Sequence, residues 1–190
     1  MPGDILESFG RYARVAGAQV VFASDEGEAA QSIVEIVNGL VRCTAAVRDR
    51  YPGLYRALEE AGGQVAVAEE IAVGEPDRSA LAVALAGGTG IVLAQAGVAE
   101  TGSVVLADDA LAPRLLSMLA DVCVALLPAP AIVRGLDEAG ALLAELDRAG
   151  HRYISMVTGP SRTADIERVL TIGVQGPKAL YIIVLVGDGA

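Results

Sequence analysis

The sequence contains no tryptophan, one histidine and two cysteines among its 190 residues. A zinc or iron–sulfur site needs three or four ligands, so His151, Cys43 and Cys123 cannot supply one, and we expect no metal or cofactor on this chain. His151 is expected to be an exposed loop residue. The cysteines lie in separate apolar segments without C-x-x-C spacing, so we expect small buried thiols in a reducing compartment; a disulfide would require the fold to bring them together.

Positive charge is also scarce, because 14 Lys and Arg residues face 24 Asp and Glu residues and the formal net charge is -10. Phosphate contacts need a basic surface, so nucleic acid is excluded as a partner. The start MPGDILESFG has no basic region before an apolar run, and we expect a cytoplasmic protein without a secretory signal. Residues 79–99 carry no charge and are long enough to span a bilayer, but their glycines and lack of basic flanks favour a buried core segment.

The residues that are abundant favour an α/β fold. Hydrophobic residues make up 53% of the chain, and its length suits one domain, which we place at residues 1–190. Helical and strand-like patterns alternate almost from end to end. Helices are predicted at 4–16, at 26–41 with Ser24 as the cap, at 52–61, near 78, at 113–120, 137–150 and 164–173. Strands are predicted at 19–23, 43–47, 64–69, twice around a turn at 100–102, at 122–128, 153–159 and 179–188.

Several predicted strands are continuous runs of Val, Ile, Leu and Ala rather than alternating patterns. Such strands are buried on both faces, and strands joined through helices pair in parallel. We therefore predict a single open, mainly parallel sheet flanked by helices. Ligands of such sheets bind beyond the carboxyl ends of the strands, where loops lead into helices.

The stretch TGPSRTADIE, residues 158–167, follows one of these predicted strands and is unusually polar. Gly159 and Pro160 predict a turn, after which Ser161 or Thr163 can cap the helix predicted at 164–173. Asp165 and Glu167 then fall in the first turns of that helix, where negative charge is favourable. A helix start therefore explains about half of the polarity.

Arg162 is the residue that a helix start does not explain. Its guanidinium can form a fork with Asp165 or Glu167, or it can bind a carboxylate or phosphate of a ligand beside the exposed amides. Both alternatives are compatible with the sequence.

A second polar cluster, VAETGSVVL at 98–106, surrounds Glu100 with small and apolar residues. Its carboxylate is either partly desolvated and suited to acid–base or nucleophilic work, or a solvated turn residue. Asp108 and Asp109 lie just beyond, and we predict an exposed helix start there rather than a metal pair.

Three segments together resemble the lactate-utilisation protein C family of LUD-domain proteins. They are VAETGS at 98–103, GPSRTADIE at 159–167 and GVQGPKAL at 173–180, and the likeness covers about the last hundred residues. The resemblance implies a fold similar to the superfamily of sugar-phosphate isomerases and coenzyme A transferases.

The resemblance also implies a role in oxidising L-lactate to pyruvate, as the subunit without iron–sulfur clusters, which reside on partner subunits. The family residues carried over to this chain are Glu100, Thr101, Gly102 and Ser103 with Gly159, Pro160, Ser161, Arg162, Thr163, Asp165 and Glu167. The alternative is a free-standing enzyme or binding protein for an anionic metabolite, such as a coenzyme A ester or a sugar phosphate. In that case Arg162 anchors the ligand, Glu100 is the catalytic carboxylate, and the two share one pocket at the rim of the sheet.

Overall fold

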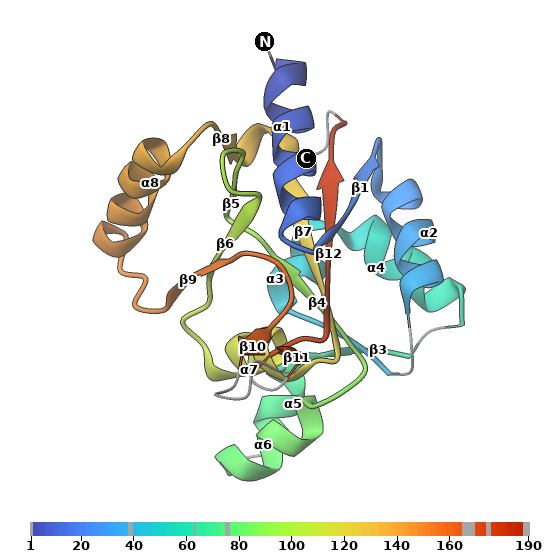
Figure 1. Cartoon of the computed structure of the whole chain (residues 1–190). Coiled ribbons are helices and arrows are strands. Elements are labelled where there is room, and N and C mark those ends of the chain that lie inside the picture. Colours follow the sequence, from blue (N-terminus) through green and yellow to red (C-terminus); the bar gives the residue numbers. More distant parts are fainter. Residues whose placement is uncertain are drawn as a thin grey trace.

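The computed structural model describes residues 2–37, 40–62, 64–74, 77–164, 170–173 and 176–187, and across these residues the largest sheet has six strands (Figure 1). All neighbouring strands in it pair in parallel. In spatial order the strands are β1 (Gln19–Ala23), β12 (Ala179–Leu185), β7 (Val122–Pro128), β4 (Thr89–Leu93), β2 (Val41–Cys43) and β3 (Val65–Val67). This sheet confirms the predicted open, mainly parallel α/β fold.

Each face of the sheet has its own hydrophobic core. One core contains α2 (Glu26–Ile36), α3 (Ala45–Arg50) and α4 (Pro52–Glu60). The other contains α1 (Pro2–Val15), α5 (Ala68–Gly74), α6 (Arg78–Leu85) and α7 (Leu111–Leu119). In the described residues we find no helix with the length and apolar character that crossing a bilayer requires, and residues 79–99 run through α6 and β4 in the core.

A second sheet, which the sequence did not predict, lies over the α1 side of the first. Within the described residues its order is β8 (Ile132–Val133), β5 (Ala96–Val98), β6 (Ser103–Ala107) and β9 (Ile154–Val157), and the short helix η1 (Ala129–Ala131) leads into β8. The predicted turn at 100–102 joins β5 to β6, which pair antiparallel. A short turn joins only antiparallel neighbours, so these two strands cannot both extend the parallel sheet.

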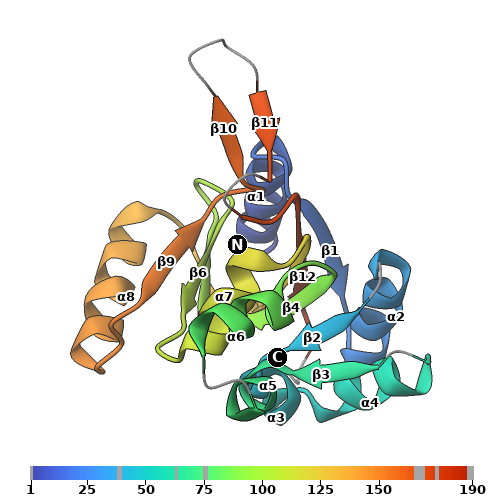
Figure 2. The same cartoon turned by 90° about the horizontal axis from the view of Figure 1, so that it is seen from below.

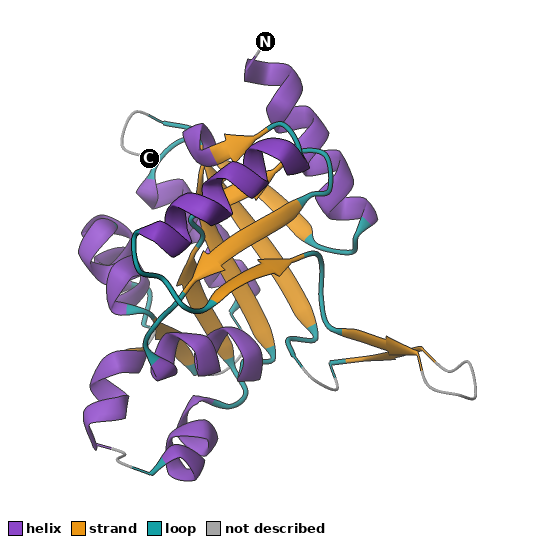
Figure 3. Ribbon diagram, turned by 90° about the vertical axis from the view of Figure 1, so that its left-hand side faces the viewer, coloured by secondary structure: helices purple, strands orange, loops and turns teal. Residues whose placement is uncertain are grey.

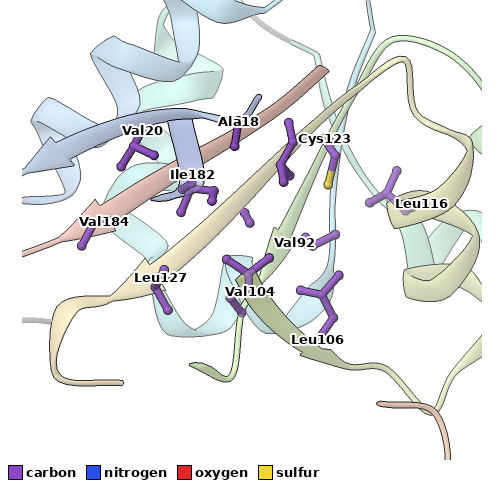
Figure 4. Close-up of a cluster of buried hydrophobic side chains, with 14 of the residues drawn as sticks. Ala18, Val20, Val92, Val104, Leu106, Leu116, Cys123, Leu127, Ile182 and Val184 are labelled. Carbon is purple, nitrogen blue, oxygen red and sulfur yellow. The ribbon is translucent and has the colours of Figure 1, made fainter. Parts of the chain in front are cut away.

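The two central strands of the second sheet, β5 and β6, are buried on both faces, while β9 at its edge is partly exposed. Val104 and Leu106 of β6 face Val92 and Leu127 of the main sheet (Figure 4). The opposite face is covered by α8 (Leu136–Arg148), whose Leu142, Leu143 and Leu146 pack there. The molecule is therefore layered as helices, parallel sheet, helices with a second sheet, and α8.

Residues 165–169 of the helix predicted at 164–173 lie outside the described residues, and the described residues on either side form two antiparallel strands instead. These strands are β10 (Arg162–Ala164) and β11 (Leu170–Ile172), which extend away from the body of the molecule (Figures 2 and 3). Thr163 pairs with Thr171, and β-branched residues of this kind favour strands over helices. The predicted cap roles of Ser161 and Thr163 are therefore wrong, because no helix begins at those residues.

Two other local predictions are corrected by hydrogen bonds between side chains and backbone at helix starts. The strand predicted at 43–47 ends at Cys43, because Thr44 caps α3 by accepting a hydrogen bond from the Val47 N–H. Asp25 rather than Ser24 caps α2, and it accepts from the Glu28 N–H at 2.8 Å. Ser24 instead donates its own N–H and hydroxyl to the Glu28 carboxylate.

The carboxyl end of α1 touches both polar loops named in the sequence analysis. A Cβ atom added to Gly102 would lie 2.0 Å from the backbone nitrogen of Ala13, and one added to Gly159 would lie 2.1 Å from the carbonyl oxygen of Ala16. Both glycines also have positive φ, at 68° and 75°. Only glycine satisfies the close approach and the conformation together.

This contact predicts that Gly102→Ala lowers the free energy of unfolding by more than about 2 kcal/mol, through backbone strain and overlap with α1. Gly140→Ala is the control, because Gly140 is exposed within α8 and nothing lies within 4 Å of an added Cβ. It should raise stability by about 0.5–1 kcal/mol. Urea denaturation measures both, and equal stability of Gly102→Ala and the parent protein would refute the close contact.

Candidate functional site

Two of the three motif segments come together into one unit. The Ser161 N–H donates to the carbonyl of Pro177 at 3.0 Å, and the Ser161 carbonyl accepts from the Gly173 N–H at 2.9 Å. A Cβ atom added to Gly176 would lie 3.0 Å from that of Ser161. The loop after β9 and the loop before β12 therefore hold each other in place.

These loops line a cavity of about 350 Å³, called here the motif cavity. Its apolar wall includes Leu106, Cys123, Ala125 and Leu180. Its polar rim includes Thr158, Ser161 and Arg162. A cavity with an apolar interior and a few polar groups at the rim is typical of a ligand site.

The motif cavity does not lie where the sequence predicted. Cys123 and Leu180 stand near the amino-terminal starts of β7 and β12, whereas the prediction was the carboxyl ends of the parallel strands. The reason is that the TGPSRT segment follows β9, which belongs to the second sheet and runs antiparallel to β6. The rule for open parallel sheets does not apply to a loop that follows such a strand.

Arg162 is exposed at the rim of the motif cavity. Its Nη2 atom would lie 1.9 Å from a Cβ added to Gly17, so the guanidinium rests directly on the turn that ends α1. Among the described residues the guanidinium forms no hydrogen bond or ion pair. Asp165 and Glu167, the predicted partners of a fork, lie outside the described residues.

Glu100 does not line the motif cavity, so the predicted shared pocket with Arg162 is wrong for the cavity that the structure describes. Its Oε2 atom accepts the backbone N–H of Leu136 at 3.0 Å and therefore holds the first turn of α8. The side chain is exposed, so of the two alternatives the solvated turn residue is the one observed. Unpaired N–H groups at a helix start favour a carboxylate in this position.

The hydroxyl groups beside Glu100 connect the two motif loops. The Ser103 hydroxyl lies 2.7 Å from the Thr101 hydroxyl and 2.7 Å from that of Thr158. Ser103 is only 1% exposed, while Thr158 reaches the rim of the motif cavity. Thr101 and Ser103 therefore support Thr158 at the rim of the motif cavity through these hydrogen bonds. Thr163 lies on β10.

A smaller cavity of about 230 Å³, called here the Asp108 cavity, adjoins the first. The two cavities share Leu106, Ser117, Met118 and Ser155. The far end of the Asp108 cavity is lined by Asp108, Arg114, Arg152 and Tyr153, and the Arg114 guanidinium lies 3.4 Å from the centre of the Tyr153 ring.

Asp108 is a candidate that the sequence analysis missed. Burial, followed by the negative charge of Glu69, raises the pKa of Asp108 to about 6. Asp109 does match the predicted exposed position, and it accepts from the Arg152 N–H and pairs with His151 Nδ1, both at 2.7 Å. The signal in the sequence was the position of Asp108 directly after SVVLA, the mainly apolar run at 103–107 that forms the buried strand β6.

The cysteines are both buried thiols, as predicted, and they are not bonded to each other. Burial raises the pKa of Cys43 and of Cys123 to about 12, so neither is a nucleophile at neutral pH. Within the ranges that the structure describes, no group of three or more His, Cys, Asp or Glu side chains is arranged to hold a metal ion.

Comparison with known proteins gives consistent matches. A family model described as the LUD domain matches residues 6–185. Lactate utilization protein C 1 of Bacillus mycoides is 39% identical over 99 residues, which cover 50% of this chain and 42% of that protein. An uncharacterised protein of Escherichia coli, YkgG, is 37% identical over 99 residues, which cover 50% of this chain and 43% of that protein. Each match spans less than half of the relative's length.

The fold also matches a solved structure over nearly its whole length. The crystal structure of a DUF162 family protein from Deinococcus radiodurans superposes with a TM-score of 0.68 at 20% sequence identity. The match covers 97% of this chain and 98% of that one. At this identity the likeness shows a shared fold.

Replacing Ser103 tests the bracing of the rim. Ser103→Ala should lower the free energy of unfolding by about 1–2 kcal/mol, because the Thr101 and Thr158 hydroxyls lose their partner. Ser32→Ala is the control, since the Ser32 hydroxyl is exposed on α2 and bonds only to the Glu28 carbonyl. Its effect should stay within about 0.5 kcal/mol. Urea denaturation at neutral pH compares the two, and similar losses would argue against the hydroxyl network.

Asp108→Asn should raise stability at pH 7. The pKa of Asp108 is about 6 in the folded chain and lower in the unfolded chain, so this carboxyl group increasingly opposes folding as the pH rises from about 4 to about 6, and the full cost is present above pH about 6. The gain should be on the order of 2 kcal/mol at pH 7 and should largely disappear as the pH falls towards about 4, the pKa of an unfolded aspartate. Denaturation curves of both proteins at the two pH values measure this. A gain of the same size at both values would contradict the raised pKa.

Proposed function

Because the chain belongs to the LUD-domain family, we propose that it is a component of lactate utilisation that takes part in the oxidation of L-lactate to pyruvate. The observation that carries the proposal is the similarity to proteins named lactate utilization protein C, at 36–40% identity over about half of this chain. Two of the segments by which the chain resembles that family build the motif cavity, which supports a role for the cavity in the same process.

Oxidising lactate to pyruvate removes two electrons, which must pass to an acceptor. Cys43 and Cys123 lie in separate hydrophobic cores, and the described residues contain no set of three or four side chains suited to an iron–sulfur cluster. The proposal therefore assigns the clusters to partner subunits. The role of this chain is then to bind the substrate or to hold it against those partners.

Arg162 is the residue proposed to bind the substrate carboxylate. A guanidinium matches a carboxylate with two parallel hydrogen bonds, and Arg162 has no partner among the described residues. Lactate and pyruvate both carry this group. The apolar wall of the motif cavity would exclude water behind the bound carboxylate and strengthen the ion pair.

The size of the motif cavity supports a second candidate, a binding protein for a larger anionic metabolite. A volume of about 350 Å³ is in the range of sites for drug-sized ligands and is much larger than a three-carbon acid needs. A coenzyme A ester or a sugar phosphate would fill more of it. In this candidate Arg162 is still the anchor, and Glu100 is not a catalytic group because it holds the start of α8.

The proposed role is tested by growth of the source organism on L-lactate. Deleting the gene should abolish or strongly slow growth on L-lactate, and the deletion strain should grow normally on pyruvate. A tagged chain from lactate-grown cells should co-purify with subunits that carry iron–sulfur clusters. Unchanged growth on lactate after the deletion would reject the proposal.

Arg162→Ala tests the anchor in the purified protein. Binding of L-lactate, pyruvate and a coenzyme A ester, measured by calorimetry, should weaken by about 1.5–3 kcal/mol for the true ligand, the range for a hydrogen bond to a charged group. Arg148→Ala is the matched control, because Arg148 is exposed at the end of α8 and does not line the motif cavity. Equal affinity of the Arg162 variant and the parent protein would remove the anchor role.

A further inference from the structure

Strand β9 has one free edge. It is the last strand of the second sheet and pairs only with β6 among the described residues. The Asp108 N–H donates to the Tyr153 carbonyl, which identifies these two residues as a hydrogen-bonded pair of the antiparallel ladder. Counting along the register, the backbone groups of Ser155 and Val157 face β6.

The alternate residues of β9 therefore point their backbone groups outward. Ile154 and Met156 are opposite Ala107 and Val105 in the non-bonded pairs, so their N–H and C=O groups face away from β6. Within the described ranges, no hydrogen bond reaches these outward groups. Natural proteins usually cover such an edge, because it is a template for another strand.

A continuous groove runs along this free edge. Residues 152–155 line the Asp108 cavity and residues 155–159 line the motif cavity, so the two cavities together follow the whole length of β9. We call them jointly the β9 groove. Helix α7 forms the facing wall with Ser117 and Met118, and Figure 1 shows β9 passing above α7.

Arginines outnumber acids along the β9 groove although the chain is strongly acidic, because Arg114, Arg152 and Arg162 line it together with one carboxylate, Asp108. Arg162 stands at one end and Arg114 at the other, and neither forms an ion pair with another described residue. The whole chain has a formal net charge of -10. The concentration of unpaired arginines along an exposed strand edge favours an occupant that carries acidic groups.

The apolar side chains around the groove suit an extended peptide. Met118, Tyr153 and Met156 are 55%, 49% and 40% exposed, and all three are among the residues that line the groove. In strand addition, main-chain hydrogen bonds supply affinity and alternate side chains enter pockets. The free edge, the apolar pocket and the two arginines match these requirements.

We propose that the β9 groove binds an extended acidic segment of a partner protein, which adds to the second sheet as a strand beside β9. Its backbone pairs with Ile154 and Met156, an apolar side chain enters the motif cavity, and acidic side chains approach Arg162 and Arg114. The inference rests on the proposed function in one respect: the partner belongs to the same lactate-utilising assembly.

Proline variants of β9 test the added strand. Met156→Pro removes an outward N–H and leaves the ladder to β6 intact, so it should fold with a melting temperature close to that of the parent protein. Met156→Ala shortens the same side chain and keeps the N–H. Ser155→Pro removes an inward N–H and should lower the melting temperature clearly, which checks the register independently of binding.

The probe is a library of random twelve-residue peptides displayed on phage and selected on the full chain. Enriched peptides should be rich in Glu, Asp and β-branched residues. Their synthetic versions should bind Met156→Pro at least about tenfold more weakly than the parent, bind Met156→Ala within a few-fold, and lose at least about tenfold when their acids are replaced by lysine. Equal binding to Met156→Pro and the parent would overturn the proposal.

Amide hydrogen exchange of the parent protein gives a test that does not depend on a variant folding. A selected peptide should slow exchange at Ile154 and Met156 and leave Ser155 and Val157 protected as before. Two results would overturn strand addition and would indicate a small-anion site instead. One is protection that appears only around Arg162. The other is complete displacement of the bound peptide by millimolar acetate or pyruvate.

Growth on lactate separates this inference from the proposed function. If both hold, the gene deletion and the Met156→Pro strain both grow poorly on L-lactate, while Met156→Ala grows well. Poor growth of the deletion with normal growth of Met156→Pro rejects the added strand and keeps the function. Normal growth of the deletion rejects the function, whatever the peptide measurements show.

Discussion

The contact between α1 and two glycines determines where the polar loops lie. Gly102 lies in the turn between β5 and β6 and Gly159 in the loop after β9, and each lets the backbone at the end of α1 approach to a distance that any side chain would prevent. The hydroxyl chain of Thr101, Ser103 and Thr158 then joins the same two loops from the side. The rim of the motif cavity is therefore built on backbone contacts and buried hydroxyls, which leaves Arg162 free for a ligand or partner.

The parallel sheet could be predicted from the sequence because its strands carry a strong local signal. Residues 122–128 and 179–185 are almost wholly apolar, and a run buried on both faces is recognisable without knowledge of its neighbours. The second sheet has no comparable signal. Its strands are short, and β8 contains only Ile132 and Val133, so their grouping depends on which segments meet in space.

The pairing of β10 with β11 shows the limit of periodicity. A ten-residue window satisfies a helical pattern by chance, while the pairing of Thr163 with Thr171 is visible only when both strands are placed side by side. The prediction of the candidate site from the sequence is limited in the same way. Arg162 was identified from its polar segment, but Glu100 instead holds the first turn of α8. The raised pKa of Asp108 comes first from its burial and then from the charge of Glu69 on α5, and neither is visible in the sequence.

The outermost layer of the molecule has the smallest core. Among the described residues, four side chains are fully buried between α8 and the second sheet, and two of the four are alanines: Ala96, Val98, Val105 and Ala139. Five larger apolar side chains pack against them but are only partly buried: Val133, Leu142, Leu143, Leu146 and Ile154. Less apolar surface is therefore exposed when α8 separates from the sheet than when either inner core opens, so we expect this layer to open at a lower free energy than the parallel sheet unfolds. Such an opening would release and re-form the periphery as one cooperative unit while the inner cores stay folded.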